Sequence, residues 1–143
     1  MTRLAIITAF TFSLVGAALA HQGVKDAKVK AWMHAMMQAG QASKTLGNMA
    51  KGTAAFDADQ AADAQAILIE VSAAIPTLFE VKSDDPVSEA LPAIWEDYAD
   101  FTGKAEAMKA ASETLDVSSA ETLTAGMRSL GRSCGGCHQS YRK

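Results

Sequence analysis

Apolar residues recur at helical spacing in four successive stretches after residue 20, and no stretch alternates apolar and polar residues over a useful strand length. The first stretch covers about 24–51 and ends before Gly52 and Thr53, which break the pattern. Within it, every seventh residue falls on a line that we expect to face the core. This line consists of Val29, Met36, Ser43 and Ala50, and the turns between them are filled by Trp32 or Met33, Ala39 or Gly40, and Leu46 or Gly47.

The second predicted helix begins at Asp57, where Gln60 stands at the spacing of a capping box. Pro76 is expected to end or kink this helix and to open a loop that runs to residue 86. The face of the helix that we expect to be buried consists of Ala61, Ala64, Leu68, Val71 and Ile75.

A third helix is predicted over about 88–115, with Pro92 in its first turn. A fourth is predicted to begin at Ser118, with Glu121 at capping-box spacing. The core-facing line of this last helix includes both cysteines, because it consists of Leu123, Met127, Leu130, Cys134, Cys137 and Tyr141. Four amphipathic helices with short links predict an all-α fold, an antiparallel four-helix bundle. Bundles bind cofactors between facing helices, so the cysteines indicate such a site near the C-terminus.

The first twenty residues have the pattern of a secretory signal peptide. Arg3 gives a short positive region, an apolar run covers 4–15, and small residues end in an Ala-x-Ala site at Ala20. We therefore expect a leader over 1–20 and a mature domain over 21–143. A membrane anchor is the alternative, but the apolar run is short for a span of roughly 20 residues. No later segment is predicted to cross a bilayer.

Composition and charge narrow the class of protein. A length of 143 residues fits one domain, and 49% apolar with only 6% aromatic residues favours long helices over strands. The net charge is −3, and loss of Arg3 with the leader leaves 12 basic against 16 acidic residues, or −4. No basic patch stands out in the sequence, which argues against nucleic acid as a partner. The acidic balance favours basic redox partners.

The two cysteines lie in Cys134-Gly135-Gly136-Cys137-His138, the attachment pattern of c-type haem. Two thiols three residues apart on a helix reach the edge of one macrocycle and form thioethers with its vinyl groups. His138 then supplies an imidazole nitrogen to the iron. Export agrees with this prediction, because bacteria attach haem outside the cytoplasm. The sequence therefore predicts one covalent haem c.

Three other uses of the cysteines are less consistent with their surroundings. A thioredoxin-like dithiol needs a strand and a helix near the motif, and here the chain is helical. A structural zinc site needs four ligands, and no second Cys/His pair is present in the sequence. A disulfide in an exported protein is the third alternative.

The whole mature chain resembles the cytochrome c′ family, the class II cytochromes c. The resemblance is carried by Ala50-Lys51-Gly52 followed by Phe56-Asp57-Ala58, by Pro92-Ala93-Ile94-Trp95, and by the haem motif with Tyr141-Arg142. It implies a four-helix bundle whose haem motif lies near the C-terminus. Members of this family often dimerise through their first two helices, and the alanine-rich faces of these helices here permit a homodimer.

The resemblance also implies the second axial ligand of the iron. Low-spin members have a methionine on the first helix, sixteen residues before the glycine of a Lys-Gly pair, and here that position is Met36. His138 and Met36 are therefore the expected axial ligands, with Met33 as the second choice. The alternative is that these methionines only fill the core. Many high-spin members carry an arginine one turn earlier, where this chain has Trp32.

Further residues near the motif have two interpretations each. Phe79, Trp95 and Tyr141 either pack against the porphyrin or belong to the bundle core. Arg142 either meets a haem propionate or is a solvated cation at the helix end. His34 lies about 200° round the helix from Met36 at 100° per residue, so it is expected on the surface.

The predicted function is outer-sphere electron transfer in the periplasm, without an enzymatic reaction, since no nucleophile, general base or substrate pocket is evident. The expected partners are periplasmic or membrane-bound redox proteins and the haem attachment machinery. The alternative is a five-coordinate cytochrome that binds NO or CO, in which Met36 only packs.

Overall fold

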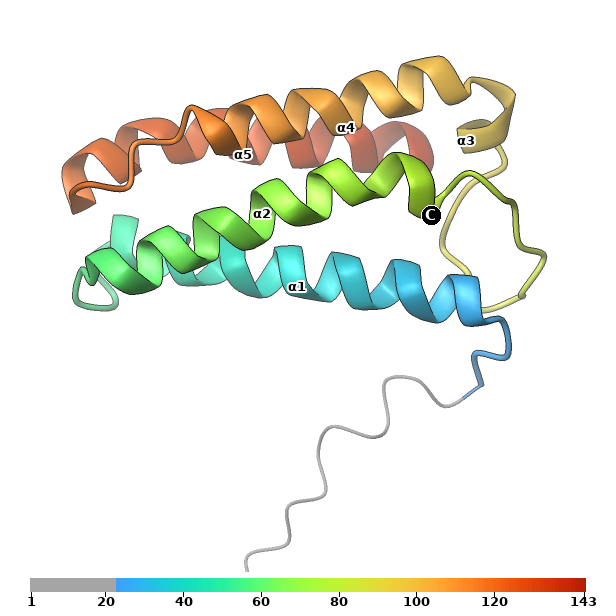
Figure 1. The fold of residues 1–143 in the computed structure, drawn as a ribbon, viewed down its shortest axis with the longest axis horizontal. Helices are drawn as coiled ribbons and strands as arrows, with labels where there is room; N and C mark the ends of the chain where they lie inside the picture. The colour runs from blue at the N-terminus through green and yellow to red at the C-terminus, as the bar shows by residue number, and fades with distance from the viewer. Residues whose placement is uncertain (1–22) are drawn as a thin grey trace, which may run out of the picture.

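The structure is a computed structural model that describes residues 23–143, and the predicted leader over 1–20 lies outside the described residues. Four long helices and one short helix form an antiparallel bundle (Figure 1). Between residues 23 and 143 there is no strand, only an isolated bridge of Ala90 and Arg142. The predicted all-α four-helix bundle is confirmed. The helices are α1 (Ala27–Ala50), α2 (Ala58–Leu78), α3 (Ala93–Glu96), α4 (Tyr98–Glu113) and α5 (Ala120–Tyr141).

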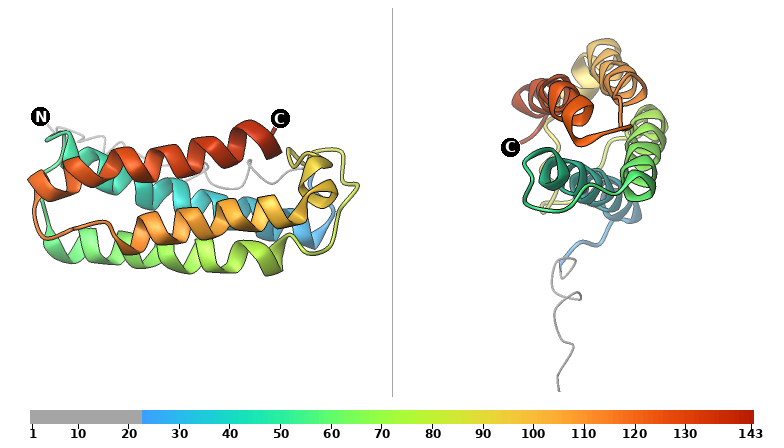
Figure 2. Two further views of the ribbon diagram at one scale, coloured as in Figure 1. Left: turned by 90° about the horizontal axis from the view of Figure 1, so that it is seen from above. Right: turned by 90° about the vertical axis from the view of Figure 1, so that its left-hand side faces the viewer.

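Each long helix packs against two others. Around the bundle α1 is followed by α2, then α4, then α5, which closes the ring against α1. The C-terminal end of α5 lies at the end of the bundle where α1 begins (Figure 2). The seam between α1 and α5 is therefore a contact between the first and last helices of the chain.

The core-facing line of α1 agrees in part with the predicted one. Val29 is buried as expected, and so are Trp32, Ala39 and Leu46 in the turns between. Met36, Ser43 and Ala50 are only half-buried. Because α1 packs against both α2 and α5, its most buried line faces the space between them, and Met36, Ser43 and Ala50 lie to one side of it, toward α5. The other buried residues of the helix are Ala35, Ala42 and Met49.

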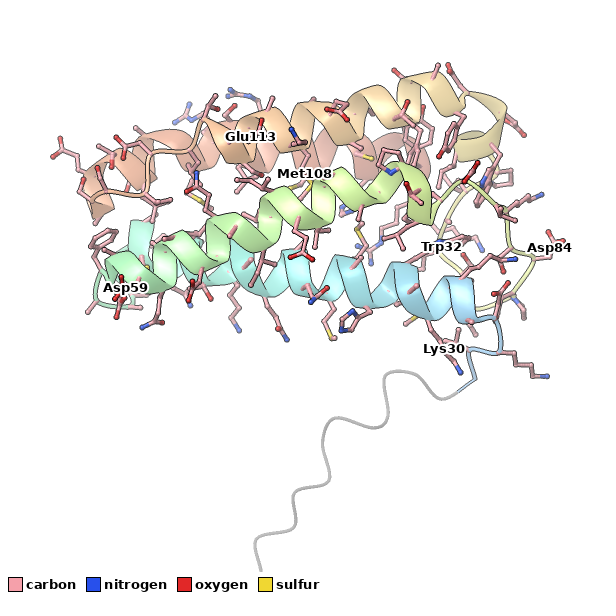
Figure 3. The ribbon with its side chains drawn as sticks, in the orientation of Figure 1. Lys30, Trp32, Asp59, Asp84, Met108 and Glu113 are labelled. Carbon is pink, nitrogen blue, oxygen red and sulfur yellow. The ribbon has the colours of Figure 1, made fainter. Side chains whose placement is uncertain are left out.

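Pro76 does not end α2, which continues to Leu78. Proline removes only the donor to the carbonyl four residues earlier, whereas the last carbonyls of any helix lack partners within the helix. Three aromatic donors from other helices bind these carbonyls, and Figure 3 shows Trp32 at this end of the bundle. They are the indole N–H groups of Trp32 (2.6 Å to the Leu78 oxygen) and Trp95 (2.8 Å to the Phe79 oxygen) and the hydroxyl of Tyr98, which donates to the Pro76 oxygen.

Two predicted helix starts are corrected. The third helix is divided into α3 and α4 at Asp97, whose side chain accepts a hydrogen bond from the Asp100 backbone and caps α4. The residues from 88 to 91 are extended beside the C-terminus instead of helical. In α5 the capping box consists of Ser119 and Thr122, one residue later than predicted. Ser118 instead donates its backbone N–H to Asp116.

Within residues 23–143, α2 has the length and composition of a membrane-crossing helix, so the prediction that no later segment does is wrong on those criteria. In the bundle α2 packs between α1 and α4 and buries Ala61 and Leu68 completely. Its outer face still carries Ile67, which is 37% exposed. α2 is therefore a core helix of the bundle, and its outer side carries the acidic Asp63 and Glu70 as well as Ile67.

Candidate haem-binding site

The last two turns of α5 carry the predicted attachment residues. Cys134 and Cys137 are half-buried, pack against the bundle core and have free thiols. Burial raises the pKa of both thiols. His138 is exposed beside them, and partial burial, followed by the positive charge of Arg142, lowers the pKa of its imidazole. This favours the neutral imidazole, which is the form that binds a metal.

The register between α1 and α5 determines what lies opposite His138. The Thr124 hydroxyl donates to the Ala50 carbonyl at 2.8 Å, and a side-chain carbon placed on Gly47 would lie 3.8 Å from Met127. These pairs belong to two antiparallel helices, so one residue forward on α5 corresponds to one residue back on α1. Counting on from residues 47 and 127 brings Met36 level with His138, about 16 Å along the seam at 1.5 Å per residue.

The α1–α5 side of the bundle is not crowded near the motif. Gly40 of α1 and Gly131 of α5 are both exposed, and a side-chain carbon placed on either would meet no atom within 4 Å outside its own helix. Toward the α4–α5 connection the packing is tight, because the same carbon on Gly126 would clash with the Leu115 side chain. Two half-buried cysteines and an exposed histidine on one end of α5 are the donor set that haem c requires, and the uncrowded side of α5 is the one that adjoins α1.

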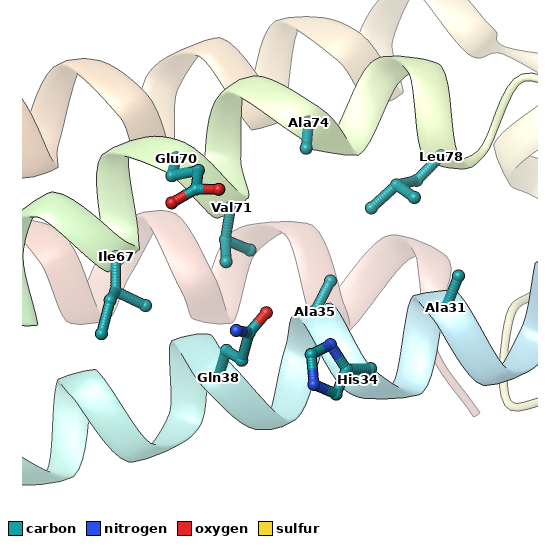
Figure 4. A pocket seen from close by; sticks show the side chains of 9 residues that line it. All are labelled: Ala31, His34, Ala35, Gln38, Ile67, Glu70, Val71, Ala74 and Leu78. Carbon is teal, nitrogen blue, oxygen red and sulfur yellow. The ribbon is translucent and has the colours of Figure 1, made fainter.

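The methionines and His34 of α1 lie at different angles to this seam. Met36 and Met33 are half-buried and pack against the core, and Met37 is 43% exposed. The register puts Met33 level with Tyr141 instead of His138. His34 is exposed, as predicted, and lines a groove of about 240 Å³ on the other side, between α1 and α2 (Figure 4).

The aromatic residues near the motif form one cluster at the end of the bundle. Phe79 stacks on Trp32 with ring centroids 4.6 Å apart, and Trp95 lies 5.8 Å from Trp32. Phe101 joins Phe79 to Tyr141 at 5.3 Å on each side. For Phe79 and Tyr141 these contacts support the interpretation as bundle core.

Trp32 has a role that the sequence analysis missed. It is 3% exposed and bound to the end of α2, although it stands where the family resemblance pointed to the haem edge. Phe101, which the sequence analysis did not single out, connects the two ends of the cluster. The clustering of aromatic residues near the ends of three predicted helices was the available signal.

Two polar pairs flank the C-terminal turn of α5. The Tyr141 hydroxyl donates to Asp100 at 2.5 Å, which raises the pKa of Tyr141 to about 12 and lowers the pKa of Asp100. Arg142 forms an ion pair with Glu89, with both nitrogen–oxygen distances 2.7 Å. Arg142 is thus an exposed, paired cation in this structure.

A helical bundle with an attachment motif on the inward line of its last helix defines a c-type cytochrome of the four-helix class. Residues 27–142 match the family described as Cytochrome C′. The chain belongs to the cytochrome c′ family. Members bind one covalent haem c, and the chain has the two cysteines for its attachment.

Named relatives agree in sequence and in structure. Cytochrome c-554 of Cereibacter sphaeroides is 37% identical over 145 residues, which cover 94% of each chain. A structural model of oxidized cytochrome c556 of Rhodopseudomonas palustris has a TM-score of 0.74 at 26% identity and covers 83% of this chain and 98% of its own. Cytochrome c′ of Rubrivivax gelatinosus has a TM-score of 0.72 at 28% identity, with 81% and 94% covered.

Proposed function

We propose that the protein is a periplasmic electron carrier whose haem iron is six-coordinate and low-spin, with His138 and Met36 as axial ligands. The observation that supports this proposal is the register of α1 and α5, which brings Met36 level with His138 on two adjacent helices. The register also favours Met36 over Met33.

The residues of the chain have separate tasks in this proposal. Haem c supplies a ferric/ferrous couple that transfers one electron. Cys134 and Cys137 hold the group through thioether bonds on α5, and His138 donates its neutral imidazole nitrogen. Met36 donates its sulfur from α1, so both ligands are fixed by the packing of two helices. A ligand pair held this way changes little between redox states, and a methionine ligand raises the reduction potential.

Export and partners complete the proposal. The leader predicted over 1–20 directs the chain to the periplasm, where the attachment machinery acts and where redox proteins supply and accept its electrons. The proposal assigns no catalytic reaction to the protein. A second copy of the chain is the proposed partner of the α1–α2 groove, because Met37 and Ile67 expose apolar surface on these two helices.

The first test compares absorption spectra of the exported ferric and ferrous holoprotein with those of Met36→Ala. We expect a low-spin ferric spectrum with a sulfur-to-iron charge-transfer band that is lost in Met36→Ala. Met33→Ala is the matched control, because it removes a half-buried methionine from the same helix, and it should keep the band.

Other results would contradict the proposal in distinct ways. A high-spin spectrum that Met36→Ala leaves unchanged, with ready binding of carbon monoxide, would favour a gas-binding protein in which Met36 only packs. A colourless exported protein would rule out covalent haem altogether.

A further inference from the structure

Charge is distributed unequally among the helices. α1 contains three lysines and no acidic residue, whereas α2 contains three acidic residues and no lysine or arginine. α5 has Arg128 and Arg132 against the single acidic residue Glu121. On α4, Lys104 and Lys109 are both paired with acidic residues. The protein has a net negative charge, yet its α1–α5 side is basic.

Three cations without an ion pair to any residue of the described range 23–143 line one groove. A groove of about 450 Å³ lies between α1 and α5 and is lined by Lys44, Lys51 and Arg128. All three side chains are exposed, and none of them forms an ion pair with any residue between 23 and 143. Neutral hydrogen-bonding groups lie between them, namely Ser43, Asn48 and Thr124.

The groove is part of the seam that holds the haem motif. Gly47 and Met127 line it, and the level of Met36 and His138 lies about 16 Å further along the same two helices. A partner protein that covers this seam would contact the cations and approach the attachment site together. The charges on the approached face, more than the net charge, determine the attraction that a docking partner feels. Salt screens exposed charges beyond the Debye length, which is about 8 Å at physiological ionic strength.

We propose that the groove formed by Lys44, Lys51 and Arg128 docks an acidic surface of the redox partner protein. The inference rests on the proposed electron-transfer function and reverses the expectation of basic partners that the net charge alone gave. Complementary charge on the approached face steers encounter and increases the association rate, even when the net charges of the two proteins repel.

Two small oxidants of opposite charge test the sign of the field at this face. The reduced holoprotein is mixed with ferricyanide, an anion, or with tris(phenanthroline)cobalt(III), a cation, between 10 and 200 mM salt. Each oxidant takes one electron from the ferrous protein. We expect the ferricyanide rate to fall by about threefold or more as salt rises, and the cobalt rate to increase. The reverse pattern would show that the net charge dominates and would overturn the inference.

Charge reversal locates the effect. Lys44→Glu with Arg128→Glu should weaken the salt dependence with ferricyanide by at least half. It should also abolish the low-salt binding of poly-L-glutamate, a macromolecular acidic probe, measured by titration calorimetry. The control is Lys82→Glu with Lys109→Glu, which changes the net charge equally at cations away from the groove. The control should retain both properties, and equal effects of the two double variants would overturn the inference.

Folding and the proposed function are checked separately. Circular dichroism and the haem spectrum of each variant report folding, and the milder pair Lys44→Gln with Arg128→Gln replaces a variant that does not fold. A high-spin wild-type spectrum with the salt pattern intact would contradict only His/Met ligation. A low-spin spectrum with no specific effect of Lys44 and Arg128 would contradict only the docking face.

Discussion

Trp32 is buried in the aromatic cluster and donates its indole N–H to the Leu78 carbonyl at the end of α2. Trp32 therefore makes two separate contacts. Its ring stacks on Phe79, and its indole nitrogen donates to the Leu78 backbone oxygen. The last carbonyls of a helix need such donors, because a buried carbonyl without a partner is costly.

Trp32→Phe is expected to lower the free energy of unfolding by about 1–3 kcal/mol, because it keeps an aromatic ring but leaves the Leu78 carbonyl without its donor. Urea unfolding of the holoprotein measures the change as a shift in midpoint at constant slope. Met37→Ala alters an exposed side chain of the same helix and should change stability by about 0.5 kcal/mol or less. Equal effects of the two substitutions would contradict the role of the indole.

The pair of Tyr141 and Asp100 predicts a pH dependence with two limits. The hydrogen bond raises the pKa of Tyr141 from 10.0 to about 12 and lowers the pKa of Asp100 below 3.8. The stabilisation from Tyr141 is therefore fully present below pH 10 and is lost as the pH rises through 12. The stabilisation from Asp100 is present above pH 3.8 and is lost as the pH falls below it.

Tyr141→Phe should therefore be less stable than the wild type between about pH 4 and 10, and the two should converge outside these limits. The measurement is the difference in urea midpoint between the two proteins as a function of pH. A difference that stays constant from pH 3 to 12 would show that the hydroxyl contributes by packing alone.

At the scale of elements, the start of α5 depends on local chemistry. Ser119 accepts from the backbone of Thr122, and the Thr122 side chain accepts from the Ser119 backbone, so two donors of the helix end are satisfied together. α5 holds the whole attachment motif at its other end, and its N-terminal turn also contributes to the register with α1 through Thr124.

Ser119→Ala is expected to cost about 1 kcal/mol of stability, because the first turn of α5 loses its cap. Thermal unfolding followed by circular dichroism gives the value. Ser118→Ala is the matched control and should have a smaller effect, since Ser118 precedes the cap. A larger loss in Ser118→Ala would support the sequence-based prediction of the helix start instead.

At the scale of the whole molecule, the two sides of the bundle next to α1 differ in chemical character. The α1–α5 seam holds the attachment motif and the basic groove, whereas the α1–α2 groove exposes apolar surface. Two proposed partners of different chemistry are thereby assigned to different sides of α1. A second copy and a redox partner would then bind without competing for one face.

Ile67→Asp tests the proposed homodimer, because it places a charge in the apolar part of the α1–α2 groove, where Ile67 is 37% exposed. Sedimentation equilibrium should show a dimer for the wild type and a monomer for the variant. Val87→Asp introduces the same charge at a side chain that is 45% exposed outside this groove, and it should remain a dimer. A monomeric wild type would contradict the proposed interface.

The sequence by itself determined the features that depend on neighbours along the chain. Helical periodicity is local, so the four helices and the inward line of α5 were predicted, and the Cys134–His138 motif is a contiguous pattern. Pro76 shows the limit of local rules, because α2 continues past it to Leu78. The donors to the last carbonyls of α2 come from Trp32, Trp95 and Tyr98 on other elements.

Tertiary structure alone decided which residues from distant elements face one another. Met36 lies at the edge of the core line of α1 because that helix packs against both α2 and α5. The register that brings Met36 level with His138 depends on contacts between the first and last helices of the chain. The net charge likewise does not predict the basic groove, because Lys44 and Arg128 come to line one groove only when α1 packs against α5.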